Sequence, residues 1–311
     1  MVTFENNIAW LFPGQASQKV GMGFDLYENT EVGLDLFQKA NHIMGYDIQK
    51  IIFKGPDDTL LQTQHTQPAI YIVSVILGTL LLEKGFTPSV VAGHSLGEYS
   101  ALTIAGSIDF ETGLNLVKVR SESMAAAGEQ KKGSMSAIVG LKDNLITEIC
   151  KSYKGAGLVV IANFNSPQQI VISGDTEAID WAMKIAKESG AKICIKLNVS
   201  GAFHSPLMRP ARENLSNALE KAHFSNANYP LFTNVNAKPL TDKTKIKECL
   251  IKQLENPVLW SDIIIAINNL GIQSFFEVGP GNVLQGLNKR INRKLKTVGF
   301  GTFQELKDLN V

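Results

Sequence analysis

The stretch Gly93-His94-Ser95-Leu96-Gly97 decides the fold prediction, because it joins the apolar run Ser89-Val90-Val91-Ala92 to a segment of helical composition from Glu98 to Ala105. Glycine on both sides of a serine is typical of the sharp strand-to-helix turn called a nucleophile elbow, where a Cβ would collide with neighbouring backbone. At the helix N-terminus, free N–H groups can stabilise an oxyanion. The alternative is that Ser95 only caps the helix. The pentapeptide alone leaves both roles open.

Further apolar runs repeat this strand-then-helix pattern along the chain. Five runs have the length of buried parallel strands, at residues 8–12, 89–92, 229–232, 273–278 and 296–300. Strands that alternate with helices predict an α/β fold with a mainly parallel sheet and functional loops at the carboxyl ends of its strands. We therefore expect Ser95 to lie at that edge of the sheet.

The middle of the chain has a different order of elements. Its pattern predicts a strand at 134–141, a helix at 143–153, strands at 158–163 and 168–173, a helix at 176–189 and a strand at 191–197. That βαββαβ order is typical of a ferredoxin-like unit. We expect a small domain of residues 133–199, inserted into a large α/β domain formed by residues 1–132 and 200–311.

Composition narrows the class of protein. The 311 residues are 44% hydrophobic and 19% charged, with a net charge of +1, so nothing in the bulk charge favours a nucleic-acid partner. The widely spaced Cys150, Cys194 and Cys249 predict reduced thiols rather than a disulfide framework or a zinc site. Residues 1–7 show no basic region followed by an apolar run, so we expect a cytoplasmic protein.

The longest apolar stretch runs from Ala69 to Leu82 and follows Pro68, a residue that suits the first position of a helix. Its length is that of a buried core helix and is too short to span a bilayer. We therefore expect a core helix that begins at Pro68, and no association with a membrane.

A serine nucleophile needs a general base, and His204 is the best candidate among the five histidines. Ser205 and Pro206 resemble a helix N-cap and a first helical residue, and a helix N-terminus disfavours the protonated imidazole. The sequence therefore predicts a neutral histidine, as a general base requires. The alternative is a structural histidine with no part in chemistry.

No acidic residue stands out as the group that would orient this histidine. Asp109 and Glu277 are both possible, and a backbone or amide oxygen could hold the imidazole equally well. His94 adjoins the candidate nucleophile in sequence, and we expect its side chain to face away from the cleft that Ser95 faces.

Arg120 stands in an apolar stripe of the helix predicted over residues 110–127. At about 100° per residue it shares a face with Leu116, Val117 and Met124, and the polar residues lie elsewhere on the helix. A buried guanidinium is costly unless an anion meets it, and arginine binds carboxylates through two parallel hydrogen bonds. Either a buried salt bridge or a carboxylic acid substrate would supply that anion.

A glycine turn follows the first predicted strand, in the sequence Phe12-Pro13-Gly14-Gln15-Ala16-Ser17-Gln18. Its backbone N–H groups could supply half of an oxyanion hole at the sheet edge that carries Ser95. Taken alone, the segment indicates only a turn.

Eight motifs in this order together resemble those of malonyl-CoA:acyl carrier protein transacylases. They are Phe-Pro-Gly-Gln at 12–15, Thr-Gln-Pro-Ala at 66–69, Gly-His-Ser-Leu-Gly-Glu at 93–98, Arg120, Asn-Ser-Pro at 165–167, Ala-Phe-His-Ser at 202–205, Asn-Pro-Val at 256–258 and Glu-Val-Gly-Pro-Gly at 277–281. The resemblance runs from about Ile8 to Arg293. It implies a hydrolase-like α/β large domain with a short parallel sheet, and a ferredoxin-like insertion.

The resemblance also implies roles for the matching residues. Ser95 would accept the acyl group, His204 would act as general acid and base, and Arg120 would bind the malonyl carboxylate. Gln253 would lie near the histidine, which would explain the missing acidic residue. The implied reaction moves malonyl from malonyl-CoA to the serine and then to the phosphopantetheine thiol of a carrier protein, with no metal or prosthetic group.

Further roles follow from the same resemblance. Backbone N–H groups of Gln15 and Leu96 would form the oxyanion hole, and Gln15 and Met124 would also contact the substrate. Phe203 is similar to members that prefer unbranched malonyl units, since its ring would crowd a substituent at C2. Ala16 stands where many members have glycine. An alanine at positive φ costs about 1 kcal/mol, so we expect an ordinary backbone angle there.

The same motifs are compatible with more than one reaction and more than one pathway. A hydrolase that clears acyl groups from carrier proteins would use the same serine and histidine, and a non-catalytic docking subunit would use neither. The pathway is fatty acid or polyketide synthesis, with a slight preference for polyketide synthesis from residues 108–114 and 162–169. We expect a monomer with an acidic carrier protein as partner. Candidate contacts are two groups of cations, one of Lys184 and Lys187 and the other of Lys289, Arg290 and Arg293.

Overall fold

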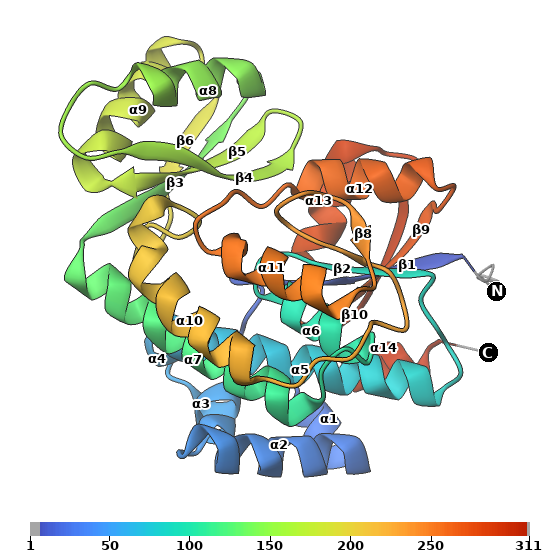
Figure 1. Ribbon diagram of the computed structural model, residues 1–311. Coiled ribbons are helices and arrows are strands. Elements are labelled where there is room, and N and C mark those ends of the chain that lie inside the picture. Colours follow the sequence, from blue (N-terminus) through green and yellow to red (C-terminus); the bar gives the residue numbers. More distant parts are fainter. Residues whose placement is uncertain (1–6, 310–311) are drawn as a thin grey trace.

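The fold is that of a computed structural model, which describes residues 7–309 (Figure 1). The expectation of a cytoplasmic protein was drawn from residues 1–7, of which residues 1–6 lie outside the described residues, as do residues 310–311. A six-stranded sheet flanked by helices forms the larger unit, and a four-stranded sheet with two helices lies above it in Figure 1. The molecule is therefore a mixed α/β protein with two separate sheets.

The larger sheet has the strand order β10-β9-β1-β2-β7-β8. Its strands are β1 (Ile8–Phe12), β2 (Val90–Gly93), β7 (Leu231–Phe232), β8 (Pro239–Leu240), β9 (Ser274–Val278) and β10 (Lys296–Phe300). Neighbours are parallel except β7 and β8, which are antiparallel. The five strands predicted from apolar runs are confirmed. The edge strand β8 was not predicted, because two residues that begin with a proline carry no alternating pattern.

Both faces of this sheet are buried. Trp10 and Phe12 of β1 enter one apolar cluster, whereas Ala9 and Leu11 enter another, and all four side chains are fully buried. Successive residues of a strand point to opposite faces, so an unbroken apolar run is what a strand between two cores requires.

Helices cover these two faces. The first cluster lies under α5 (Thr63–Glu83), α6 (Gly97–Ile104) and α7 (Phe110–Gln130), and the second under α12 (Trp260–Asn269) and α13 (Val283–Ile291). The remaining helices of the larger unit are α1 (Phe24–Asn29), α2 (Glu31–Met44), α3 (Ile48–Lys54), α4 (Asp57–Leu60), α10 (Arg209–Lys221), α11 (Lys243–Gln253) and α14 (Phe303–Lys307), with a 3-10 turn at Pro206–Met208.

Helix α5 is a core helix as expected, but it does not begin at Pro68. It begins at Thr63 and carries Pro68 inside. The turn before the proline is held by tertiary contacts, since Thr66 Oγ1 donates to the Leu60 carbonyl and Gln67 contacts Arg120. By length and composition α5 could cross a membrane, yet 78% of its most apolar window is buried inside the protein.

The smaller sheet has the order β4-β5-β3-β6, and all its neighbouring strands are antiparallel. Its helices and strands occur in the predicted order, which is β3 (Gly133–Val139), α8 (Asp143–Ser152), β4 (Val159–Ser166), β5 (Gln169–Asp175), α9 (Thr176–Glu188) and β6 (Ile193–Lys196). Ile138, Ile170 and Ile172 pack against α8 and α9 on one face. On the other face, Met135 and Ala137 line a cavity shared with the larger unit.

Candidate active site

The elbow around Ser95 is built as the glycine pattern predicts. Strand β2 ends at Gly93 and helix α6 begins at Gly97, and Ser95 between them has φ 52°. A Cβ on Gly93 would lie 1.8 Å from the carbonyl carbon of Gly97, and a Cβ on Gly97 would lie 2.0 Å from the Phe12 carbonyl oxygen. Only glycine fits at these two positions, and the turn they permit holds the serine in a backbone region that L-residues rarely adopt.

The side chain of Asn234 holds this strained turn through two hydrogen bonds. Its Oδ1 accepts the Ser95 backbone N–H at 2.8 Å, and its Nδ2 donates to the Gly93 carbonyl at 2.7 Å. The side chain is fully buried. No local pattern in the sequence indicated this residue. Its position just after β7, at the carboxyl end of the strand beside β2, is where polar residues of a functional site are expected.

Ser95 and His204 form a hydrogen-bonded pair. The serine Oγ lies 2.8 Å from His204 Nε2, and His204 Nδ1 lies 2.9 Å from the backbone carbonyl oxygen of Gln253. A carbonyl only accepts, so Nδ1 carries the proton and Nε2 is free to accept one from the serine. Burial, and secondarily the charge of Arg120, lower the pKa of His204 to about 3. The imidazole is therefore neutral, as a general base requires.

Neither acidic candidate orients this histidine. The Asp109 carboxylate accepts the Thr112 N–H at 2.7 Å and so caps helix α7. The Glu277 carboxylate accepts the N–H groups of Leu284 and Gln285 at 2.9 and 3.0 Å. The backbone oxygen that the sequence left as an alternative takes this place.

Arg120 is fully buried beside the serine. Its Nη2 donates to Ser95 Oγ and to Gln253 Oε1, each at 3.0 Å, and its Nη1 donates to Gln67 Oε1. Within residues 7–309 no carboxylate pairs with it directly, so the buried salt bridge weighed as an alternative is not what the structure has. Burial lowers the pKa of Arg120, because it disfavours the charged guanidinium. An anion that binds to the guanidinium would offset this cost.

Gln253 connects the groups of this site. Its Nε2 donates to the Ser95 carbonyl at 2.9 Å and to Glu98 Oε2 at 2.7 Å, while its Oε1 accepts from Arg120. Together with the contact of its backbone oxygen to His204, one residue of α11 touches nucleophile, base and cation. The family resemblance implied that Gln253 lies near the histidine, and its backbone oxygen lies 2.9 Å from His204 Nδ1.

Gln15 and Leu96 each present a backbone N–H for which no partner is found in residues 7–309. Gln15 lines the cavity that also contains the serine. Ala16 beside it has φ 81°, so the expectation of an ordinary angle is wrong. The tight turn is held by local hydrogen bonds, since Ala16 N–H donates to Gln18 Oε1 at 2.8 Å. These bonds offset an alanine strain of about 1 kcal/mol.

A cavity of about 440 Å³ opens at the serine between the two sheets. Phe203 and Leu197 are among the residues that line it, with Leu284 and Leu287 of α13. His94 lines it too, with its Nε2 2.9 Å from Asn165 Oδ1, so the expectation that His94 faces away is wrong.

Met124 is not among the residues that line this cavity in the described chain. It is buried behind Gln67, whose Nε2 donates to its sulfur at 3.4 Å. Gln67 lies in the Thr-Gln-Pro-Ala motif, but no local pattern predicted its place in this site. Its Nε2 also lies 3.3 Å from Gln15 Oε1.

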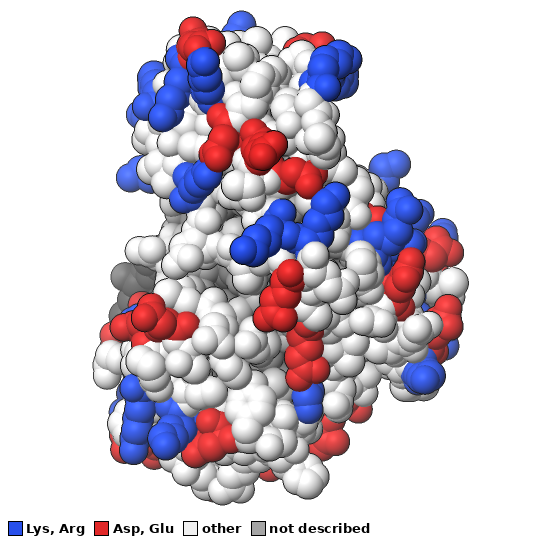
Figure 2. Space-filling view, turned by 90° about the vertical axis from the view of Figure 1, so that its left-hand side faces the viewer, with Lys and Arg blue, Asp and Glu red and all other residues white. Residues whose placement is uncertain are grey.

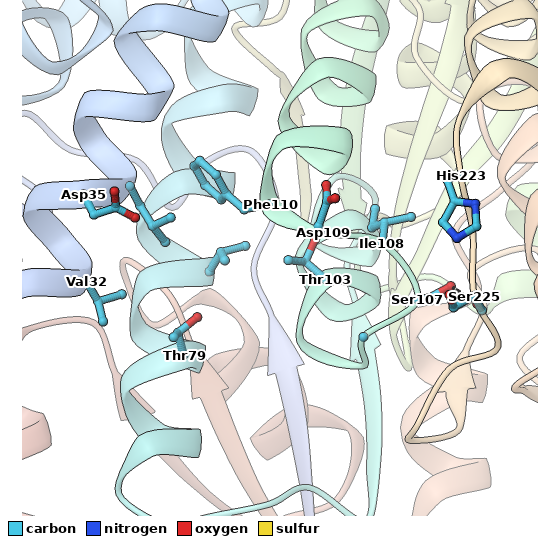
Figure 3. Close-up of a pocket in the computed structure, with 13 residues that line it drawn as sticks. Val32, Asp35, Thr79, Thr103, Ser107, Ile108, Asp109, Phe110, His223 and Ser225 are labelled. Atoms are coloured by element: carbon cyan, nitrogen blue, oxygen red, sulfur yellow. Dashed lines mark hydrogen bonds between the residues drawn. The ribbon is translucent and has the colours of Figure 1, made fainter.

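A second hollow, of about 590 Å³, lies elsewhere, between α2, α5 and the start of α7 (Figure 3). In Figure 3 His223 and Asp35 stand on opposite sides of it, and Asp109 is engaged in capping its helix. It shares no lining residue with the cavity at Ser95. No nucleophile and base are paired there, so we place the candidate active site at the first cavity.

Residues 9–299 match the family described as the acyl transferase domain. A malonyl CoA-acyl carrier protein transacylase of Bacillus subtilis (strain 168) is 42% identical over 294 residues, which cover 94% of this chain and 93% of that protein. The chain belongs to the malonyl-CoA:acyl carrier protein transacylase family. A transacylase of Synechocystis sp. (strain ATCC 27184 / PCC 6803 / Kazusa) is 40% identical over 301 residues, or 97% of this chain and 99% of that protein.

Solved transacylase structures have the same fold. The transacylase of Coxiella burnetii superposes with a TM-score of 0.94 at 39% identity, covering 97% of this chain and 96% of that one. A chain from a complex of a type II PKS acyl-carrier protein with its malonyl-transacylase superposes with a TM-score of 0.93 at 39% identity, covering 97% and 98%. The pairing of a parallel-containing sheet with a second, antiparallel sheet is thus shared with the transacylase family.

Proposed function

We propose that this protein transfers the malonyl group of malonyl-CoA to the phosphopantetheine thiol of an acyl carrier protein, through a malonyl ester on Ser95. The observation that carries the proposal is the position of Ser95 Oγ, 2.8 Å from His204 Nε2 and 3.0 Å from Arg120 Nη2. A nucleophile between a neutral base and a cation that forms no salt bridge within residues 7–309 suits an acyl donor that also bears a carboxylate.

In the first half-reaction the serine attacks the thioester carbonyl carbon while His204 Nε2 takes the hydroxyl proton. Negative charge develops on the carbonyl oxygen, and the N–H groups of Gln15 and Leu96 are the donors that would stabilise it. Collapse of this intermediate breaks the carbon–sulfur bond, and the histidine returns its proton to the leaving thiolate of CoA. The product is a malonyl ester on Ser95.

The second half-reaction reverses these steps with a new thiol. The histidine takes the proton of the phosphopantetheine thiol, whose sulfur attacks the ester carbon. The serine oxygen leaves and regains its proton from the imidazole. Atoms and protons balance over the two steps.

Two residues would select the acyl group. Arg120 would hold the free carboxylate, at the cost of giving up its hydrogen bond to the serine hydroxyl. Phe203 lines the cavity next to His204 in sequence, so its ring would crowd a substituent at C2. Such a ring discriminates against one methyl group by about 1 to 3 kcal/mol.

The acidic carrier protein would dock near α13. Lys289, Arg290 and Arg293 line a hollow of about 690 Å³ together with Lys192 of the smaller unit. Gln169 lines both this hollow and the cavity at the serine, and it accepts from Arg290 Nη1 at 2.9 Å. These cations therefore adjoin the entrance that a phosphopantetheine arm would use.

The other cation group has a less suitable position. Lys184 and Lys187 are exposed on α9, which packs on the face of the smaller sheet opposite to the cavity. Lys184 is also within 3.9 Å of Glu188. On the face shown in Figure 2, Lys and Arg are interspersed with Asp and Glu rather than gathered into one field.

Charge reversal of each pair tests this placement. Lys289→Glu with Arg290→Glu should raise the KM for the carrier protein about tenfold and leave the KM for malonyl-CoA nearly unchanged. Lys184→Glu with Lys187→Glu is the matched control and should change neither. Equal effects of the two double variants would refute docking at α13.

We further propose that residues 133–199 form a ferredoxin-like domain inserted into a hydrolase-like domain of residues 1–132 and 200–311, in a cytoplasmic monomer. The strand order β4-β5-β3-β6 and the βαββαβ element order support the first part. The three free cysteines support the cytoplasm.

Incubation with malonyl-CoA and holo carrier protein tests the proposed reaction against hydrolysis and against a docking role. We expect malonyl-carrier protein to accumulate in step with released CoA. Free malonate without malonyl-carrier protein would establish a hydrolase, and no release of CoA would establish a docking subunit.

A further inference from the structure

Glu98, the second residue of α6, is a buried acid that none of the roles above uses. The side chain is 1% exposed. Its Oε2 accepts the backbone N–H of Asn234 at 3.2 Å and Gln253 Nε2 at 2.7 Å, and its Oε1 has no hydrogen-bond partner among the described residues. Burial of a carboxylate is costly when one of its oxygens accepts no hydrogen bond, so a functional role for Glu98 is worth testing.

Both hydrogen-bond partners of Glu98 are themselves hydrogen-bonded to the reacting groups or to the turn that carries them. Asn234 holds both sides of the elbow through the Gly93 carbonyl and the Ser95 N–H. Gln253 gives its backbone oxygen to His204 and its side-chain oxygen to Arg120.

The carboxylate also fixes which way the Gln253 amide points. Its Nε2 faces three acceptors, which are Glu98 Oε2, the Ser95 carbonyl and Asn234 Oδ1. The amide oxygen is thereby directed at the guanidinium of Arg120. If the amide were flipped, its NH₂ group would face the N–H groups of Arg120, and its oxygen would face the three acceptors.

We propose that Glu98 is a positioning residue of the transfer reaction, an inference that rests on the proposed function. Through Asn234 it fixes the nucleophile, and through Gln253 it fixes the base and the cation. Its negative charge makes a second contribution: the ionised carboxylate balances Arg120 in the free enzyme and so opposes binding of the substrate carboxylate at the same cation.

The groups with which Glu98 interacts electrostatically are Arg120 on α7, its neighbour Tyr99 on α6, and Cys249 on α11. Burial raises the pKa of Tyr99 and of Cys249, so both stay neutral at neutral pH, and Arg120 stays charged. Burial raises the pKa of Glu98 itself to about 7. Glu98 is thus the member of this group that changes charge near neutral pH.

Two variants separate the hydrogen bonds of Glu98 from its charge. E98Q keeps an oxygen for Asn234 and Gln253 and removes the charge, whereas E98A removes both. We expect E98Q to keep kcat within about threefold of the wild type and E98A to lose about 10- to 100-fold, because the support of the elbow is lost.

The pH dependence of KM gives a readout that a purely structural role would not move. In the wild type, ionisation of Glu98 repels the incoming carboxylate, so KM for malonyl-CoA should rise on the order of tenfold as pH increases from about 6 to about 8. In E98Q that rise should vanish, and KM should stay at the low-pH value. Because the wild type and E98Q are measured with the same malonyl-CoA, ionisation of the phosphate groups of that substrate affects both proteins equally.

Ser100→Ala is the matched control on the same helix, since Ser100 is buried and its hydroxyl has no hydrogen-bond partner in the described chain. It should leave kcat and the pH profile unchanged. A KM in E98Q that rises with pH as in the wild type would overturn the inference, and so would equal losses of kcat in E98Q and E98A. A wild-type protein that forms no malonyl adduct on Ser95 would instead refute the proposed function.

Discussion

His204 Nδ1 lies 2.9 Å from the backbone carbonyl oxygen of Gln253, and this contact takes the place of an acidic residue in orienting the base. A carbonyl cannot be protonated in the range where enzymes work, so the orientation of the imidazole does not depend on pH. It also brings no negative charge to offset burial, which lowers the pKa of His204 to about 3.

Acylation of Ser95 should depend little on pH on the acid side of neutrality. A histidine is an active base above its pKa, so a lowered pKa keeps His204 neutral on the acid side of 6.5. At saturating malonyl-CoA, the single-turnover rate constant for loading Ser95 should therefore stay level from about pH 8 down to about pH 5. A fall with a midpoint near 6.5 would mean that the base has an ordinary pKa.

Replacement of Arg120 tests the carboxylate site. In Arg120→Gln the charge-assisted bonds to a malonyl carboxylate are lost, so the rate of malonyl loading should fall about 100-fold or more, while acetyl loading from acetyl-CoA should change far less. Quenched-flow loading of both donors measures the ratio. Equal losses for the two acyl groups would show that Arg120 supports the site without recognising the carboxylate.

Phe203 should set the tolerance for branched acyl groups. In Phe203→Ala the space beside the serine grows, so the ratio of methylmalonyl to malonyl loading should rise about tenfold. Val283→Ala is the control, because Val283 lines the same cavity but is 38% exposed at its edge. An unchanged ratio in Phe203→Ala would remove the ring from any role in selectivity.

The elbow glycines predict a contrast in stability. Gly93→Ala would place a Cβ 1.8 Å from backbone of Gly97, so the free energy of unfolding should fall by more than about 3 kcal/mol. Gly286 lies inside helix α13 with nothing within 4 Å of an added Cβ. Gly286→Ala should therefore stabilise by up to about 1 kcal/mol. Urea unfolding measures both, and similar values for the two would contradict the steric account.

Elements with a local pattern could be predicted from the sequence. Strands β1 and β10 have the bounds expected from their apolar runs, and the βαββαβ order of the smaller unit follows from alternating patterns within about 70 residues. Burial of Arg120 could be predicted because helical periodicity alone places it among apolar residues.

The supporting residues could not be predicted in the same way. The contacts of Asn234 and Gln253 with the elbow join residues more than 130 positions apart, and no local pattern encodes them. The angle at Ala16 and the helix turn before Pro68 departed from expectation because hydrogen bonds and tertiary contacts outweigh local preference there. Glu98 belongs to the Gly-His-Ser-Leu-Gly-Glu motif at 93–98, but its burial depends on tertiary packing and could not be predicted from that motif.

Intact mass spectrometry after exposure to malonyl-CoA shows whether Ser95 carries the malonyl group. The wild type should gain one malonyl group and lose it when holo carrier protein is added, with a matching gain of mass in the carrier. Ser95→Ala should gain none. A malonyl adduct that persists in Ser95→Ala, or a wild-type protein that gains none, would contradict the assignment of Ser95 as the group that carries malonyl.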